Sequence, residues 1–235
     1  MPGEFSGRRK MKKFSQKPVI ALPKGRLFKE GWNFLRKYGF VEKEPEKIEK
    51  SRNLIIKEKV LDIILTKPVD VPAYVDHGIA DIGVVGKDVI VEAYLEGKNF
   101  YSLHPLPFAK CRMSVAAPLD FSIKDKTFLT VASKYPLTAR EFFLRKGIPV
   151  EVVKLYGSVE LAPLTGLADC IVDIVETGRT LKENDLEEKE VIFESWAYLI
   201  ANKTSFSLHS EIISSLVEAA STEWESYMSE ENNGG

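Results

Sequence analysis

The sequence predicts an α/β protein with two lobes and a ligand cleft between them. Short apolar runs rich in β-branched residues alternate with segments of helical periodicity along most of the 235 residues. This alternation is typical of a largely parallel sheet covered by helices. Three of the apolar runs end in polar turns, at 24–26, 86–88 and 177–180, and each turn leads into a predicted helix. Because parallel strands place their carboxyl ends at one edge of a sheet, we expect these turns to share a ligand site.

The first lobe is expected to comprise residues 18–107. Its strands are predicted from apolar runs at 19–22, 54–56, 60–65 and 81–85. A helix should begin near Arg26, because apolar residues recur after it at helical spacing, and another should end at Leu95. Two prolines in 66–72 predict a loop, and two more between 103 and 108 predict the crossing to the second lobe.

The second lobe is expected to comprise residues 108–191. Its predicted strands are 112–117, 128–132, 150–154 and 170–175, and its predicted helices are 138–146 and 158–166. Extended runs and a last amphipathic helix in about 192–222 should return the chain to the first lobe. We expect residues 1–17 to be a disordered tail or a vector-derived remnant, and residues 223–235 to be a tail.

Composition narrows the class of protein. A net charge of -1, with 44% hydrophobic and 29% charged residues, gives no support to nucleic-acid binding. No run approaches the roughly 18 apolar residues that span a bilayer, and no apolar segment follows the basic cluster 8–10 as in a secretory signal. A nucleic-acid-binding or membrane-binding arm is the alternative for this basic cluster. Cys111 and Cys170 form neither a disulfide framework nor a metal-ligand pattern, so a reducing cytoplasm is expected.

The stretch 170–181 carries the most informative chemistry. An apolar strand leads to two acids, Asp173 and Glu176, and then to a turn formed by Thr177, Gly178, Arg179 and Thr180 before a helix. Free backbone N–H groups at a helix start, together with hydroxyl and guanidinium donors, can hold a phosphate. Carboxylates accept hydrogen bonds from the vicinal hydroxyls of a ribose and can hold Mg²⁺. The stretch therefore predicts a ribose phosphate site, with a purely structural turn as the alternative.

Two cations follow the first predicted strand, as the polar turn at 177–180 follows the strand at 170–175. Lys24 and Arg26 flank Gly25 directly after the apolar run 19–22. We expect their side chains at the carboxyl edge of the sheet, where open α/β folds bind ligands. Solvated surface charge is the alternative, since lysine and arginine are mostly exposed in any protein.

Five ordered motifs resemble the catalytic subunit of the ATP phosphoribosyltransferase family. They are residues 22–27, 70–75, 80–88, 157–164 and 173–181. The resemblance covers roughly 18–217 and implies the two-lobed, type II fold of periplasmic binding proteins, with a central cleft between the lobes. It implies the first step of histidine biosynthesis, in which N1 of ATP adenine displaces pyrophosphate from 5-phosphoribosyl 1-pyrophosphate. Phosphoribosyl-ATP is the product, and Mg²⁺ is carried by the substrate and not by protein ligands.

The resemblance also implies roles for individual residues. Catalytic arginines that bind pyrophosphate and triphosphate are matched by Arg26 and Arg52. The site for phosphoribosyl pyrophosphate is matched by Glu160, Asp173, Glu176, Thr177, Gly178, Arg179 and Thr180. The ATP site is matched by Lys24, Gly25, Arg26, Lys67, Asp88 and Cys111. Lysine at position 67 departs from the usual arginine and cannot form the same bidentate contact with a phosphate. Glu160 and Cys111 could instead be a helix-cap residue and a core residue.

The length matches the short form of the family, because no sequence remains for a C-terminal regulatory domain after the last predicted helix. The resemblance then implies a homodimer that assembles with a regulatory subunit related to histidyl-tRNA synthetase. A cytoplasmic module of the same fold that binds a small anion without catalysis is the alternative. Carboxylates beside the 177–180 turn argue against that alternative, because an anion receptor gains nothing from them.

Overall fold

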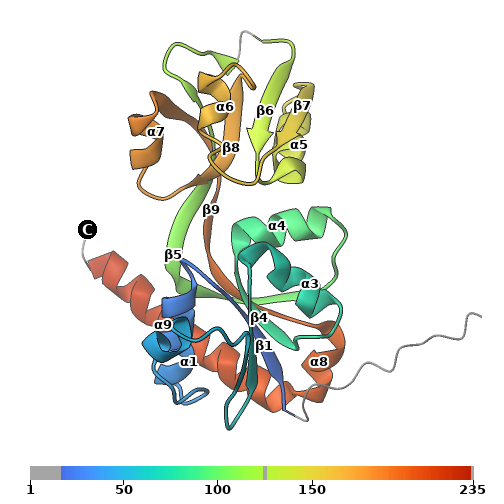
Figure 1. Ribbon diagram of the computed structural model, residues 1–235, viewed down its shortest axis with the longest axis vertical. Helices are drawn as coiled ribbons and strands as arrows, with labels where there is room; N and C mark the ends of the chain where they lie inside the picture. Colours follow the sequence, from blue (N-terminus) through green and yellow to red (C-terminus); the bar gives the residue numbers. More distant parts are fainter. Residues whose placement is uncertain (1–16, 124–125, 234–235) are drawn as a thin grey trace, which may run out of the picture.

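Two lobes joined by two long strands make up the part of the chain that the computed structural model describes, residues 17–123 and 126–233 (Figure 1). The connecting strands are β5 (Tyr101–Pro118) and β9 (Leu186–Ala201), which pair antiparallel along nearly their whole length. Each runs from one lobe into the other, so the two crossings expected near the prolines and near residue 192 lie inside continuous strands. The expectation for residues 1–16 and 234–235 lies outside the described residues.

A single nine-stranded sheet runs through the described part of both lobes in the order β2-β3-β1-β4-β9-β5-β8-β6-β7. The remaining strands are β1 (Val19–Pro23), β2 (Ile55–Lys57), β3 (Asp62–Thr66), β4 (Ile82–Gly86), β6 (Leu129–Ser133), β7 (Val150–Lys154) and β8 (Cys170–Val175). Pairing is parallel around β1 and around β6 but antiparallel at β2, β5 and β9. The prediction of a largely parallel sheet is therefore wrong for the centre. Strands that travel out to the second lobe and back must run in opposite directions.

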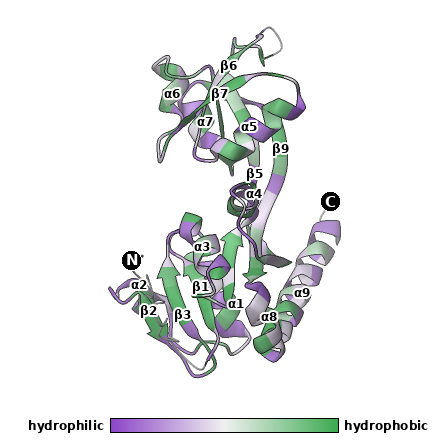
Figure 2. Ribbon diagram, turned by 90° about the vertical axis from the view of Figure 1, so that its right-hand side faces the viewer, coloured by the Kyte–Doolittle hydropathy of each residue, from purple (hydrophilic) through white to green (hydrophobic). Residues whose placement is uncertain are grey.

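Helices cover both faces of the sheet (Figure 2). They are α1 (Phe28–Lys37), α2 (Pro45–Glu49), α3 (Val71–Asp76), α4 (Lys87–Leu95), α5 (Pro136–Arg145), α6 (Leu161–Leu164), α7 (Arg179–Glu183), α8 (Lys203–Leu208) and α9 (Ser210–Asn233), with the 3-10 turn η1 (Pro68–Asp70). One core lies under α1, α2 and α9 in the first lobe. A second core continues from α3 and α4 of the first lobe into α5 of the second lobe, so the lobes share buried apolar surface.

The C-terminal segment differs from its prediction. Residues 223–235 were expected to be a tail, but α9 continues without interruption to Asn233. Trp224 packs edge-on against Trp196 of β9 at 5.6 Å between ring centroids, and Tyr227 packs beside Trp224 at 5.8 Å. Two aromatic rings on one face of the helix anchor the segment, although its many acidic and polar residues are typical of a tail.

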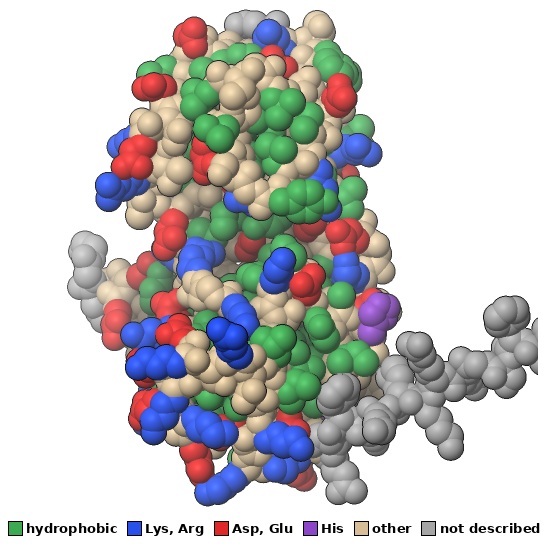
Figure 3. All heavy atoms as spheres, in the orientation of Figure 1, with side chains coloured by type: hydrophobic (Ala, Val, Ile, Leu, Met, Phe, Trp, Pro, Cys, Tyr) green, Lys and Arg blue, Asp and Glu red, His purple; other side chains and the backbone are tan. Residues whose placement is uncertain are grey.

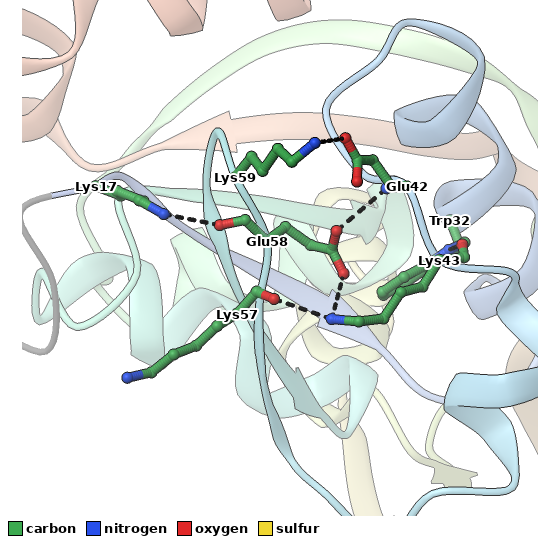
Figure 4. A network of polar contacts seen from close by, with 7 residues as sticks. All are labelled: Lys17, Trp32, Glu42, Lys43, Lys57, Glu58 and Lys59. Carbon is green, nitrogen blue, oxygen red and sulfur yellow. Dashed lines mark hydrogen bonds and ion pairs between the residues drawn. The ribbon is translucent and has the colours of Figure 1, made fainter.

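A network of polar contacts around Glu58 fixes the β2–β3 hairpin against the segment that follows α1 (Figure 4). The buried Glu58 carboxylate lies 2.8 Å from Lys43 Nζ and accepts a hydrogen bond from the backbone N–H of Glu42 at 3.2 Å. Lys43 also donates to the Lys57 carbonyl. These contacts position the far end of the hairpin, away from the edge of the sheet at which the predicted site residues gather.

Candidate functional site

A pocket of about 230 Å³ opens between the lobes. In Figure 3 the surface is hollowed there, and charged side chains of both signs gather around the hollow. The lining residues come from the β1–α1 turn of the first lobe, from β5, and from the α6 and β8–α7 regions of the second lobe. They are Arg26, Cys111, Glu160, Ile171, Asp173, Ile174, Val175, Glu176, Thr177, Gly178, Arg179, Thr180 and Leu181.

Asp173 projects into this pocket from β8 while its side chain is almost fully enclosed, with the residue 6% exposed. One carboxylate oxygen accepts a hydrogen bond from Lys134 Nζ at 3.0 Å, and the other accepts one from the backbone N–H of Ile174 at 2.9 Å. Burial raises the pKa of Asp173 above its usual range, and the nearby Glu160 adds to this, while Lys134 opposes it. Sequence reasoning missed Lys134. The available signal was a lysine directly after a predicted strand, as at Lys24.

The β8–α7 loop presents small and polar groups to the pocket. Gly178 adopts a left-handed conformation with φ of 76°, which other residues rarely adopt, and so turns the chain sharply into α7. The hydroxyl of Thr177 accepts a hydrogen bond from the backbone N–H of Arg179 at 3.3 Å. The side chains of Arg179 and Thr180 are exposed, and Arg179 pairs only with its helical neighbour Glu183 in the described residues. The loop can therefore offer hydroxyl and guanidinium groups to a ligand.

Arg112 of β5 contacts the backbone of the β8–α7 loop. Sequence reasoning also missed this residue. Its Nη1 donates to the backbone carbonyl of Glu176 at 3.2 Å, and its Nε donates to both carboxylate oxygens of Glu188 at 2.9 and 2.7 Å. A charge-assisted pair of this kind is stronger than a neutral hydrogen bond. Arg112 lies within a predicted strand. Its partners can be identified only from the pairing of β5 with β8 and β9 in the structure.

Arg26 connects the first lobe to the loop of the second. Its Nη1 lies 3.5 Å from Oε2 of Glu176, and its Nη2 donates to Sγ of Cys111 at 3.5 Å. Burial raises the pKa of the Cys111 thiol by more than Arg26 lowers it, so the sulfur is a neutral thiol near pH 7. Since the Glu176 side chain is 60% exposed, its ion pair with Arg26 is weak and can exchange for a phosphate ligand.

Comparison with known proteins now identifies the family. The family model "HisG: ATP phosphoribosyltransferase" matches residues 67–221, about two thirds of the chain. The chain belongs to the ATP phosphoribosyltransferase family. Proteins named ATP phosphoribosyltransferase from Halalkalibacterium halodurans and Aquifex aeolicus are 46% and 47% identical to it, and the alignments cover 85% of this chain and 93% of each relative.

Solved structures agree with this assignment. The ATP phosphoribosyl transferase (HisG:HisZ) complex from Thermotoga maritima contains a chain that is 34% identical, with a TM-score of 0.76 and coverage of 88% of this chain and 98% of that one. The periplasmic aliphatic sulphonate binding protein SsuA from Escherichia coli is 12% identical with a TM-score of 0.56 and covers 92% and 77% of the two chains. This second likeness concerns the fold alone. It confirms the two-lobed periplasmic-binding-protein architecture.

Several residues that the family resemblance assigned to ATP lie outside the main pocket. Lys24 and Gly25 line a second hollow of about 180 Å³ over α1 and α2. The backbone N–H of Lys24 donates to the Thr66 carbonyl at 2.8 Å. Lys67, the next residue after Thr66, therefore lies near Lys24 at the carboxyl edge of the sheet. The exposed Arg52 precedes Leu54, whose carbonyl accepts a hydrogen bond from the Leu65 N–H beside that edge. These cations form a basic margin on the first lobe, and their contacts with ATP stay a prediction.

Asp88 does not line the main pocket. It is 4% exposed, and its carboxylate is occupied by the hydroxyls of Tyr135 and Ser195 at 2.6 and 3.1 Å. Asp173 also has two protein donors, but it lines the pocket, whereas the Asp88 carboxylate lies off the pocket lining. A contact of Asp88 with ATP therefore stays a prediction that this geometry does not favour.

Within 17–123 and 126–233, no group of three or more His, Cys, Asp or Glu side chains is arranged to hold a metal ion. In the same part of the chain, no helix has the length and apolar character needed to cross a bilayer.

Proposed function

We propose that this chain catalyses the transfer of a phosphoribosyl group to N1 of the adenine of ATP, the first step of histidine biosynthesis. The observation that carries the proposal is the pocket in which Arg26 of one lobe faces the Asp173-to-Thr180 segment of the other. Family membership supports the reaction, and this geometry supports the assignment of residues to each part of the ribose substrate.

The ribose phosphate fits the second-lobe side of the pocket. Hydroxyls of Thr177 and Thr180 and the turn at Gly178 suit the 5-phosphate, because they combine donors with close backbone approach. The carboxylates of Asp173 and Glu176 suit the vicinal ribose hydroxyls, which donate to carboxylates. Asp173 is held by Lys134 in one orientation, so it can accept a hydroxyl without rearranging.

The leaving pyrophosphate fits the first-lobe side. In the reaction the N1 electron pair forms a bond to C1 of the ribose while the bond from C1 to pyrophosphate oxygen breaks, and the pyrophosphate departs with that electron pair. Arg26 can exchange its exposed partner Glu176 for a pyrophosphate oxygen and stabilise the developing charge. Arg52, Lys24 and Lys67 on the basic margin suit the triphosphate of ATP. Mg²⁺ bound to the substrate would neutralise part of the pyrophosphate charge, and Asp173 and Glu176 could accept hydrogen bonds from its bound waters.

We further propose that a regulatory subunit binds this chain. The HisG:HisZ title of the Thermotoga maritima structure supports a partner of that kind. Histidine inhibition would then require the partner. A homodimer and a cytoplasmic location are part of this proposal. The location is expected because both substrates are charged intracellular nucleotides or sugar phosphates.

The test is formation of phosphoribosyl-ATP from ATP, 5-phosphoribosyl 1-pyrophosphate and Mg²⁺, with pyrophosphatase present to draw the equilibrium forward. Glu176→Ala should lower the rate about 10-fold to 150-fold, because a charge-assisted hydrogen bond is lost. Glu151→Ala, at an exposed position on β7, is the matched control and should retain full activity. Chelation of Mg²⁺ should abolish turnover.

Histidine, added in a parallel run, should inhibit only after the regulatory subunit is supplied. Absence of product with and without that subunit would overturn the proposal and favour a binding module of the same fold. Near-normal turnover by Glu176→Ala would contradict the assignment of the loop.

A further inference from the structure

Helix α5 of the second lobe is capped by a carboxylate of the first lobe. Glu92 of α4 accepts hydrogen bonds from the backbone N–H groups of Leu137 and Thr138 at 2.9 and 2.8 Å, and from the Thr138 hydroxyl at 2.7 Å. These N–H groups lie in the first turn of α5, where no partner exists within the helix. The Tyr135 side chain at the cap position offers no cap of its own. Glu92 therefore performs across the lobes the task that a local Ser or Asp usually performs.

A second polar contact lies one helical turn away on α4. Asp88 accepts a hydrogen bond from the Tyr135 hydroxyl at 2.6 Å and another from Ser195 of β9 at 3.1 Å. Burial, with the nearby Asp88 charge, raises the pKa of Tyr135, so its hydroxyl remains a donor. Asp88 is 4% exposed and Glu92 8% exposed, so both carboxylates are desolvated and fully partnered by the protein. Removal of a partner at such a site is costly because a buried charge is left unsatisfied.

Apolar side chains surround these contacts. Val89, Ile90 and Ala93 of α4 belong to the same buried cluster as Ala139 and Phe143 of α5. In Figure 1, α4 lies at the top of the first lobe and α5 at the base of the second, facing one another. We call the Asp88, Glu92, Tyr135 and Thr138 contacts, with this apolar surround, the α4–α5 joint. It connects the lobes through side-chain contacts, in addition to the two crossing strands.

The joint leads directly to the pocket. Tyr135 follows Lys134, whose ammonium group holds the carboxylate of Asp173. Ser133, at the end of β6, donates its hydroxyl hydrogen bond to the Val172 carbonyl of β8 and accepts one from the Tyr135 N–H. Segment 133–138 is thus bonded to α4 on one side and to β8 on the other.

We propose that Asp88, Glu92 and Tyr135 are positioning residues for phosphoribosyl transfer, because they hold Lys134 and Asp173 of the second lobe in register with Arg26 of the first. None of the three lines the pocket, and each acts through segment 133–138, which contains Lys134. Small misplacement of reacting groups lowers rates strongly. This inference rests on the proposed function for its kinetic part, while the joint itself can be measured without catalysis.

The kinetic experiment compares Tyr135→Phe and Glu92→Gln with the intact chain. Tyr135→Phe removes one hydroxyl and keeps the ring in the core, and Glu92→Gln keeps the shape but loses the charge. Each should lower kcat about fivefold to thirtyfold, with KM for phosphoribosyl pyrophosphate changed by less than about threefold. Glu141→Gln is the matched control, because Glu141 lies on α5 and pairs only with Arg145 at the surface among the described residues. Circular dichroism at the assay temperature verifies that every variant is folded.

Amide hydrogen exchange at Leu137 and Thr138 tests the joint directly. Both amides should exchange slowly in the intact chain, with or without phosphoribosyl pyrophosphate and Mg²⁺, and faster in Glu92→Gln. Unchanged kcat in folded Tyr135→Phe and Glu92→Gln would overturn the positioning role. Rapid exchange of both amides in the intact chain would overturn the joint. An intact chain that shows slow exchange but no turnover would contradict the proposed function and leave the joint in place.

Discussion

Asp173 places an unfavourable buried charge in the lining of the pocket. Its carboxylate is buried at the end of β8, and burial raises its pKa even though Lys134 donates to it. A group whose pKa is raised in the folded chain binds its proton more tightly there than in the unfolded chain. Stability therefore falls as pH rises through the window between the ordinary aspartate pKa, about 3.9, and the raised value. Near neutral pH the ionised Asp173 carboxylate therefore lowers the free energy of unfolding.

Asp173→Asn should accordingly raise the melting temperature at about pH 7 and lower the rate of phosphoribosyl-ATP formation about tenfold or more, because the neutral amide is a poorer acceptor for a ribose hydroxyl. The gain in melting temperature should disappear near pH 3, where the wild-type carboxyl is protonated in both states. Calorimetry across this pH range, with Asp120→Asn at an exposed turn as control, measures the effect. A variant that is less stable than wild type at neutral pH would contradict the sign.

Among the helices and strands, the end of α9 differs most in role from its prediction, because the expected tail is a helix that packs on the crossing strands. Lys110, in the irregular part of β5 directly before Cys111, donates to Glu231 at 2.9 Å and lies 5.3 Å from the ring centroid of Trp196. Trp224 packs on the same tryptophan. The last turns of α9 therefore brace the crossing strands beside the pocket. They lie beyond residue 221, where the match to the family model ends.

Trp224→Ala should destabilise the chain by about 1–3 kcal/mol, less than a fully buried tryptophan, because Trp224 is half-buried. Trp224→Phe should retain most of the stability, since a ring remains against Trp196. Met228→Ala, at an exposed position of the same helix, should change stability by less than about 0.5 kcal/mol. Urea unfolding monitored by circular dichroism gives the three values. Equal effects of Trp224→Ala and Met228→Ala would show that the helix end is not anchored.

Strand-turn-helix units were predictable from the sequence because their information is local. The apolar run at 170–175 placed β8 correctly, and the loop after it does line the pocket, although α7 begins at Arg179, inside the turn predicted at 177–180. Lys134, Arg112 and the joint were not predictable, because their partners lie far away in the chain: Lys134 and Asp173 are 39 residues apart, and Arg112 and Glu188 are 76 apart. Asp88 belonged to a recognisable motif, yet the motif did not reveal that its carboxylate faces the other lobe.

At the scale of the whole molecule, the two sides of the lobe interface differ. On the side of α4 and α5, buried carboxylates and a shared core join the lobes. On the pocket side, Arg26 and Glu176 form one weak and partly exposed ion pair. We therefore expect substrate binding to draw the lobes together only on the pocket side, with the α4–α5 joint as the pivot.

Spin-label distances can measure this asymmetric closure. A pair of labels at Lys29→Cys on α1 and Lys182→Cys on α7 reports on the pocket side, and a pair at Glu96→Cys beside α4 and Arg140→Cys on α5 reports on the joint side; all four positions are exposed. The native thiols should react slowly, because burial raises the pKa of Cys111 and raises that of Cys170 to about 12.

Saturating phosphoribosyl pyrophosphate with Mg²⁺ should shorten the pocket-side distance and leave the joint-side distance unchanged, because the buried contacts of α4 with α5 have no reason to break. Glu92→Gln should broaden the joint-side distance distribution, since the cap across the lobes is weakened. Equal shifts on both sides would mean that the lobes move as independent bodies about the crossing strands. No shift on either side would mean that the pocket is already closed before the substrate binds.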